Sequence, residues 1–301
     1  MMVTQPVTHP AAPPGQETAV ASSQSAWQLP VLILVALIVA IYWGVGIKLV
    51  QDWYANPDFS HGFLVPPFAA YLIWTKRDAL RRTPIHQSWG GVWLVVAAIF
   101  MLFLGVYGAE LFLSRISFVM LLAGLIWTMA GRPFLRELRF PLLVLLLAIP
   151  FPQVVYNQIT FPLQIFASKL ASAALPVFGV PVMRDGNIIQ LPSMQLEVAE
   201  ACSGIRSLMS LFTAAIFYGY FLEPKVSKRV ILAIAALPIA VLANGVRILG
   251  TGLAVQYWDP QKALGFFHEF SGWLIFVFSL ICLYLLHVAM NLMSRLRRRH
   301  A

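Results

Sequence analysis

Long, uninterrupted apolar runs constrain the fold of this chain more than any other feature. The first of them extends from Leu29 to Val50, and several similar runs follow it. A helix of about 18 or more apolar residues can cross the hydrocarbon core of a bilayer, which is roughly 30 Å thick. Charged residues make up only 11% of the chain, whereas a soluble domain carries about 25%. The sequence therefore predicts an integral membrane protein.

About eight runs are predicted to be membrane helices. Their ranges are 29–50, 60–75, 90–109, 112–130, 138–155, 203–222, 230–253 and 271–292. The run 60–75 is short and contains Pro66 and Pro67, which membrane helices tolerate where neighbouring groups satisfy the freed backbone. The predicted fold class is all-α, a polytopic membrane domain over residues 29–293 with about eight transmembrane helices and a small extracytoplasmic β-hairpin.

Basic residues orient these helices. They gather between alternate runs, in four clusters: Lys76, Arg77, Arg81 and Arg82; Arg132, Arg136 and Arg139; Lys225, Lys228 and Arg229; and Arg295, Arg297, Arg298 and Arg299. The positive-inside rule assigns that side to the cytoplasm, with both termini inside. The net charge of +9 is thus explained by membrane orientation. It forms no surface patch for nucleic acid, so membrane lipid is the expected partner.

The remaining segments lie outside the apolar runs. Residues 1–28 are rich in Pro, Ala, Ser and Gln and are predicted to be a disordered cytoplasmic tail. Residues 294–301 are predicted to be a basic cytoplasmic tail. The segment 156–202 is expected on the opposite face, where it begins with the spacing of an amphipathic interfacial helix. Within it, Asp185-Gly186 between apolar runs indicates a β-hairpin turn, and MQLEV alternates as a short strand does.

Cys202 is the candidate nucleophile. It lies in VAEACSGIRS, where a polar strand end meets the start of an apolar helix. Free N–H groups at a helix N-terminus lower the pKa of a thiol and can bind an oxyanion. Gly204 would let a substrate backbone approach closely. Arg206, four residues after Cys202, could tune the thiolate or hold a lipid phosphate. The alternative is a small buried cysteine, which is also our interpretation of Cys282.

Four other polar residues are candidates. Arg247, in ANGVRILG, lies near the outer end of an apolar run, where a guanidinium by default marks a functional site. Asn244, one turn earlier, would brace it. His268, in GFFHEFSGW, begins the last run, and its imidazole can exchange protons with a thiol and a leaving amine. The alternatives are an arginine that snorkels to the interface and a histidine of the polar belt. His61, in NPDFSHGFLVPP, fits a pocket-lining and a structural role equally.

Cys202, Arg247 and His268 fall at the outer ends of three consecutive predicted helices. Consecutive helices usually pack side by side, so the three side chains could converge. A nucleophile, an oxyanion stabiliser and an acid/base are the groups that acyl transfer needs. Two other residues are predicted to have no part in it: Arg115 would snorkel, and His287 would pack.

The sequence resembles the exosortases. AEACSGIRS, NGVRI and FFHEFSGW occur in that order on adjacent predicted helices, like the three signature regions of that family. NPDFSHGFLVPP and RDGNIIQLP upstream are also similar, so the resemblance extends from about residue 30. It implies that Cys202 is the nucleophile, Arg247 the oxyanion or substrate stabiliser, and His268 the acid/base.

The resemblance further implies a bacterial cysteine protease or transpeptidase in the inner membrane, with its active site on the periplasmic side. Its substrates would be exported proteins with C-terminal PEP-type sorting signals (PEP-CTERM), cleaved through a thioester and linked to exopolysaccharide production. The sequence has no HExxH motif, glycine-rich phosphate loop or cysteine pair, so neither a metal nor an organic cofactor is predicted.

Three alternative functions would require other features in the sequence. A transporter or assembly component for exopolysaccharide would place polar residues near mid-membrane and often contains inverted repeats. A thiol–disulfide oxidoreductase would need a second cysteine on the same face. A noncatalytic scaffold would leave the set of cysteine, arginine and histidine unexplained.

Overall fold

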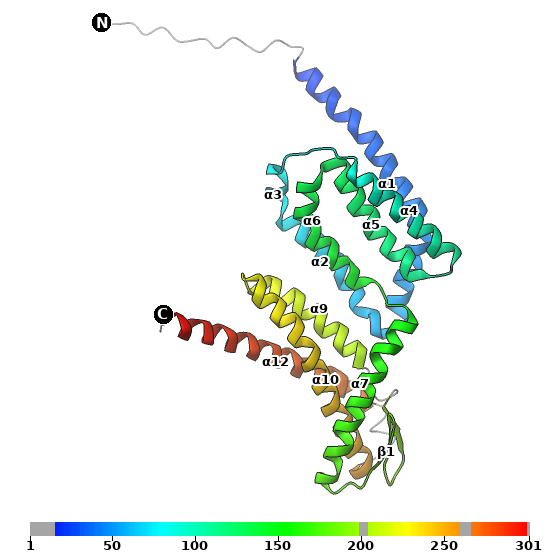
Figure 1. Cartoon of the computed structure of the whole chain (residues 1–301), viewed down its shortest axis with the longest axis vertical. Coiled ribbons are helices and arrows are strands. Elements are labelled where there is room, and N and C mark those ends of the chain that lie inside the picture. Colours follow the sequence, from blue (N-terminus) through cyan, green and yellow to red (C-terminus); the bar gives the residue numbers. More distant parts are fainter. Residues whose placement is uncertain (1–15, 199–203, 259–265, 300–301) are drawn as a thin grey trace. The chain divides into compact units, whose positions relative to one another are not determined.

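The computed structural model describes residues 16–198, 204–258 and 266–299 (Figure 1). The chain divides into two units after Lys48. The first unit contains the start of helix α1 (Gln16–Ala55), and the second, from Leu49 onward, contains all other elements. The predicted disordered tail is corrected in part, because α1 begins at Gln16 rather than at Leu29. Extending an existing helix requires no new nucleus. Residues 1–15 lie outside the described part.

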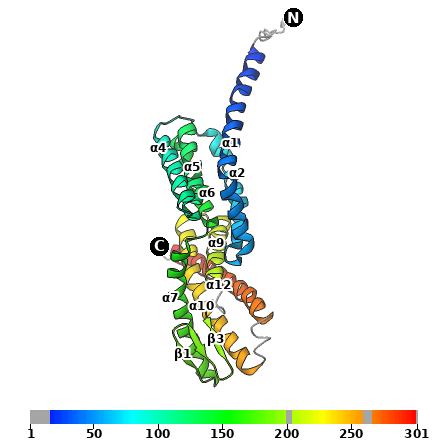
Figure 2. The ribbon, with the colours of Figure 1, turned by 90° about the vertical axis from the view of Figure 1, so that its right-hand side faces the viewer.

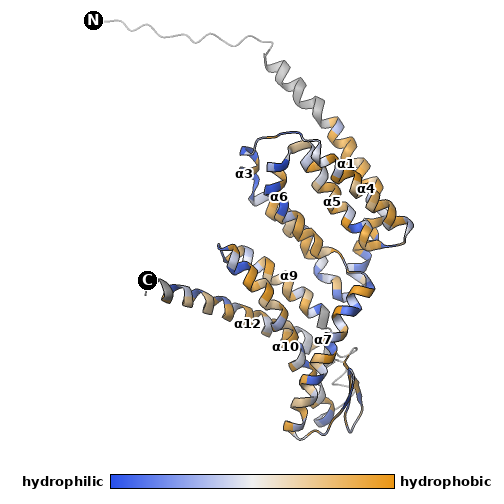
Figure 3. Cartoon of the chain, in the orientation of Figure 1, coloured by the Kyte–Doolittle hydropathy of each residue, from blue (hydrophilic) through white to orange (hydrophobic). Residues whose placement is uncertain are grey.

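Helices make up most of the second unit. They are η1 (Pro57–Leu64), α2 (Val65–Thr75), α3 (Arg77–Arg82), α4 (Gly90–Tyr107), α5 (Leu111–Ala130), α6 (Arg132–Leu145), η2 (Leu146–Ala148), α7 (Gln153–Ala174), η3 (Leu175–Phe178), α9 (Gly204–Leu222), α10 (Val226–Tyr257) and α12 (Phe266–Arg299). Apolar residues dominate the long helices (Figure 3). The last helix continues through the basic residues up to Arg299, so most of the predicted C-terminal tail is helical.

Among the residues that the structure describes, six helices are long and apolar enough to cross a membrane. They span Leu29–Ala55, Gly90–Tyr107, Leu111–Ala130, Gln153–Phe178, Val226–Tyr257 and Phe270–Leu296. The prediction of a mostly helical membrane protein is confirmed, but the count of about eight spans is not. The predicted spans in α2, α6 and α9 are not among the six. Helices α2 and α6 have only 11 and 14 residues, about 17 and 21 Å at 1.5 Å per residue. The six include α7, which the sequence suggested as an interfacial helix.

Successive helix ends alternate between two sites in the second unit. The segments 52–59, 109–115 and 150–153 line one cavity, so the end of α1, the α4–α5 turn and the start of α7 lie together. At the opposite ends of α2 and α6, Lys76 Nζ donates to Glu137 Oε2 over 3.0 Å. This alternation agrees with the topology expected from the apolar runs. Which end faces the cytoplasm stays a prediction.

A small antiparallel sheet follows α7. Its strands are β1 (Met183–Asp185), β2 (Ile188–Gln190) and β3 (Gln195–Glu197), in the order β1-β2-β3. Asp185 pairs with Ile188, and Gly186 begins the turn with φ +59°, a conformation that glycine adopts without steric cost. The predicted hairpin is confirmed, and the predicted MQLEV strand is its third member.

The sheet packs against α7 and α10 (Figures 1 and 2). Ile189 and Leu196 are buried in one apolar cluster with Ala171 of α7 and Ile248 of α10. Because Ile248 directly follows Arg247, the same stretch of α10 supports both the sheet and a candidate site residue. Packing of the sheet thus supports the region of α10 that contains the candidate residue Arg247.

Helix α7 approaches the same half of α10 at two glycines. A Cβ added at Gly245 would lie 2.5 Å from Cδ2 of Leu170, and one added at Gly252 would lie 3.2 Å from Cδ2 of Leu175. Real Cβ atoms do not approach another atom within 2.5 Å, so a side chain at position 245 would force Leu170 to shift. Small residues at such contacts are typical of packed membrane helices.

Candidate active site

Arg247 is buried between α10 and α12. Its side chain is only 4% exposed, and its Nε donates to Oγ of Ser271 over 3.4 Å. A Cβ at Gly272 would lie 3.4 Å from Nη2 of Arg247, so the guanidinium lies directly against the first part of α12. This position does not fit a snorkelling arginine, which keeps its charged group in water. The guanidinium instead contributes to a polar contact inside the helix bundle.

Arg247 belongs to a row of buried polar residues on α10. Asn244 and Thr251 are each 5% exposed, and both lie within about one turn of Arg247 on the side where i, i+3 and i+4 positions meet. The sequence predicts a role for Asn244 but gives no sign of one for Thr251. That Asn244 braces the guanidinium stays a prediction.

The structure does not describe the side chains of the other two proposed catalytic residues. Cys202 lies outside the described residues; β3 ends at Glu197 and α9 begins at Gly204. That the cysteine lies at the junction of a strand and a helix start stays a prediction. His268 is in the first turn of α12, three residues before Ser271, and its side chain is not described. The convergence of all three side chains stays a prediction.

Arg206 is anchored by a carboxylate from another part of the chain. It lies in the first turn of α9, and its Nε donates to Oδ1 of Asp58 in η1 over 3.0 Å. Oδ2 of Asp58 accepts a hydrogen bond from the Tyr156 hydroxyl of α7 over 2.5 Å. Three elements thus meet at one carboxylate, next to the segment that contains Cys202.

Asp58 and Tyr156 are residues that sequence reasoning missed. The motif NPDFSHGFLVPP was noted for His61, not for its acidic residue. A signal was present, because the chain has only 12 Asp and Glu residues and one of them lies in this motif.

His61 occupies a structural position. It is 8% exposed, and its Nε2 donates to the carbonyl oxygen of Leu147 over 3.1 Å. Trp53 Nε1 likewise donates to the carbonyl oxygen of Ala148 over 2.7 Å. Burial lowers the pKa of His61, which keeps its imidazole neutral. These contacts fasten η1 and the end of α1 to η2. Of the two roles that the sequence leaves open for His61, they favour the structural one.

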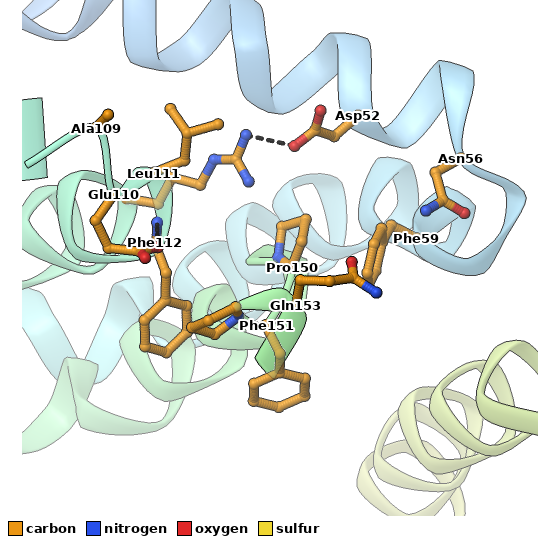
Figure 4. A pocket seen from close by; sticks show the side chains of 12 residues that line it. Asp52, Asn56, Phe59, Ala109, Glu110, Leu111, Phe112, Pro150, Phe151 and Gln153 are labelled. Carbon is orange, nitrogen blue, oxygen red and sulfur yellow. Dashed lines mark hydrogen bonds and ion pairs between the residues drawn. The ribbon is translucent and has the colours of Figure 1, made fainter. Parts of the chain in front are cut away.

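Arg115 differs from its predicted role. It is 4% exposed and forms an ion pair, 2.5 Å long, with Asp52 (Figure 4). The snorkelling prediction is therefore wrong, because an acidic partner on α1 stabilises the charge within the protein. Both residues line a cavity of about 320 Å³, whose wall also includes Phe59 and Gln153. The cavity lies close to Asp58. The ring of Phe59, which lines the cavity, packs against the ring of Tyr156, which bonds Asp58, and the two ring centroids are 6.1 Å apart.

His287, predicted to be a packing residue, belongs to a buried polar network. Its Nδ1 is 2.6 Å from the Tyr218 hydroxyl, and its Nε2 is 3.2 Å from Oε2 of Glu223. Burial acts to raise the pKa of Glu223, but the N–H of Lys225, His287 and the charge of Lys228 together lower it. The network joins α9, the α9–α10 turn and α12 at the ends remote from Arg247.

Known proteins were compared with the whole chain. A family model described as transmembrane exosortase matches residues 53–285, which contain every candidate site residue. Neither the curated proteins nor the solved structures contain a match to the chain.

Proposed function

Because this chain belongs to the transmembrane exosortase family, we propose that it is a membrane-embedded cysteine protease or transpeptidase that processes C-terminal sorting signals. One structural observation supports the proposal most directly. Arg247 is buried against Ser271 and Gly272, so the NGVRI and FFHEFSGW motifs are in contact. A buried guanidinium beside a helix that begins with a histidine is a suitable setting for acyl transfer.

The proposed reaction begins at Cys202. Its thiolate attacks the scissile carbonyl carbon, and Arg247 with backbone N–H groups near Gly204 stabilises the resulting oxyanion. His268 gives a proton to the leaving amine as the C–N bond breaks. The product is a thioester on Cys202. Water or an acceptor amine then attacks this thioester, releasing the thiolate and either a carboxylate or a new amide.

The proposed substrates are exported proteins with a PEP-type motif, a membrane helix and a basic tail, processed on the periplasmic side of the bacterial inner membrane. This assignment rests on the family and on the expected topology. Asn244 would brace Arg247, and Arg206 would contribute to substrate binding. Processing would be linked to exopolysaccharide production and surface sorting.

Mass spectrometry of a processed substrate tests this proposal. Cells with the wild-type protein should yield a shortened substrate whose new C-terminus is a carboxylate or an adduct. Cys202→Ala should yield only full-length substrate while the protein stays at normal abundance in the membrane. Cys282→Ala, the matched control, should process normally. Normal processing by Cys202→Ala would contradict the proposal.

A further inference from the structure

Building on the proposed function, we propose that Asp58 and Tyr156 are positioning residues that aim Arg206 at the substrate. In this arrangement the terminal amino groups of Arg206 bind a carboxylate of the peptide beside the scissile bond. Arg206 would then determine specificity for an acidic residue, and the NPDFSHGFLVPP motif would owe part of its function to Asp58.

Several hydrogen bonds hold Asp58 in place. Both carboxylate oxygens of Asp58 accept hydrogen bonds, one from Arg206 and one from Tyr156. The backbone N–H of Asp58 donates to the Asn56 side chain over 3.0 Å, which caps η1. The Asp58 carboxylate is only 18% exposed, so its ion pair is partly shielded from water and is stronger than a fully exposed one.

Arg206 pairs with Asp58 through Nε, which leaves its two terminal amino groups available to a ligand within the part of the chain that the structure describes. A guanidinium that serves only as a structural counter-ion often bonds a carboxylate through two parallel N–H groups. Here the structure records one bond, from Nε, and in the part of the chain that it describes the terminal amino groups of Arg206 have no partner. The side chain is 45% exposed. These amino groups can donate two parallel hydrogen bonds to a second carboxylate.

The position of Arg206 in the chain indicates which anion it would bind. Arg206 is in the first turn of α9, four residues after Cys202. A peptide whose scissile carbonyl carbon reaches Cys202 must pass its flanking residues close to that turn. A peptide carboxylate is therefore the anion that the reaction itself brings to Arg206, whereas a lipid phosphate would have to compete with the substrate for this place.

Two peptides distinguish specificity from a general loss of activity. Both span the cleavage site mapped in a processed substrate, and they differ only in a Glu or a Gln beside the scissile bond. Full-length protein in detergent should cleave the Glu peptide with a kcat/KM about 10- to 100-fold higher, as expected for a charge-assisted hydrogen bond. Arg206→Gln should remove this preference, so that the Glu and Gln peptides are cleaved with equal kcat/KM.

Positioning by Asp58 predicts an effect on KM rather than on kcat. Asp58→Asn and Tyr156→Phe should raise KM for the Glu peptide and leave kcat near the wild-type value. Equal losses on the Glu and Gln peptides in all three variants would overturn the inference. So would a preference that depends on anionic lipid in the assay and not on the peptide charge.

A charge exchange separates this role from a purely structural ion pair. The double variant Asp58→Arg with Arg206→Asp can re-form the pair, so its thermal stability should recover relative to either single variant. Its preference for the Glu peptide should nevertheless be lost. Recovery of both stability and preference would show that the pair is only structural. Cys202→Ala should abolish cleavage of both peptides, which tests the proposed function independently.

Discussion

At the scale of single residues, Arg247 and Arg206 show two ways of holding a guanidinium near a membrane. Arg247 is buried and bonds a serine hydroxyl on the neighbouring helix. Arg206 is half exposed and bonds a carboxylate. A developing oxyanion interacts more strongly with a buried cation than with one that water screens. This difference is why we propose Arg247, not Arg206, as the oxyanion stabiliser.

Substitutions at Arg247 and His268 should fail at different steps. Arg247→Lys keeps the charge but loses the planar fork, and losing an oxyanion donor slows thioester formation about 10²- to 10³-fold. His268→Ala removes proton transfer, which is worth about 10²- to 10⁴-fold. A thioester substrate has a good leaving group, so it should partly rescue His268→Ala and rescue Arg247→Lys much less. Rates of acyl-enzyme formation measure both effects, and equal rescue would mean that the two roles are assigned wrongly.

At the scale of elements, local patterns predicted well and long-range contacts did not. The hairpin at Gly186 was predictable because turn chemistry acts within a few residues. The bond between Asp58 and Arg206 joins positions 148 apart, and no periodicity reports such a pairing. Helix α7 is a related case, because the sequence predicts an interfacial helix there, whereas the structure has a helix long and apolar enough to cross a membrane. Its apolar residues pack on α10 and on the sheet, and burial against protein gives the same sequence pattern as burial in the interface.

The α7–α10 contact can be tested with two glycines of α10. Gly245→Ala would place a Cβ 2.5 Å from Leu170, whereas a Cβ at Gly250 meets nothing within 4 Å. Overpacking of this kind typically costs about 1–3 kcal/mol. Gly245→Ala should therefore lower the thermal unfolding midpoint of the detergent-solubilised protein and reduce processing. Gly250→Ala, the matched control, should change neither. Equal stabilities would show that the two helices are not in close contact at Gly245.

At the scale of the whole molecule, the proposed chemistry requires a particular orientation in the membrane. The hairpin and the α9–α10 turn belong to opposite ends of α9 in the proposed topology. An impermeant thiol reagent should label a cysteine introduced at Asp185 in cells whose outer membrane has been permeabilised. It should not label a cysteine introduced at Lys225. The reverse pattern would place Cys202 in the cytoplasm, where exported substrates do not present their processed signals.

Most directly, the covalent intermediate tests whether Cys202 is the nucleophile. Purified protein is mixed with a sorting-signal peptide, quenched with acid and digested, and the peptides are mapped by mass spectrometry. The expected result is an acyl adduct on Cys202 that hydroxylamine removes, present also in Cys282→Ala. Cys202→Ala should form no adduct and no cleaved product. An adduct on another residue, or cleavage by Cys202→Ala at the wild-type rate, would contradict the account.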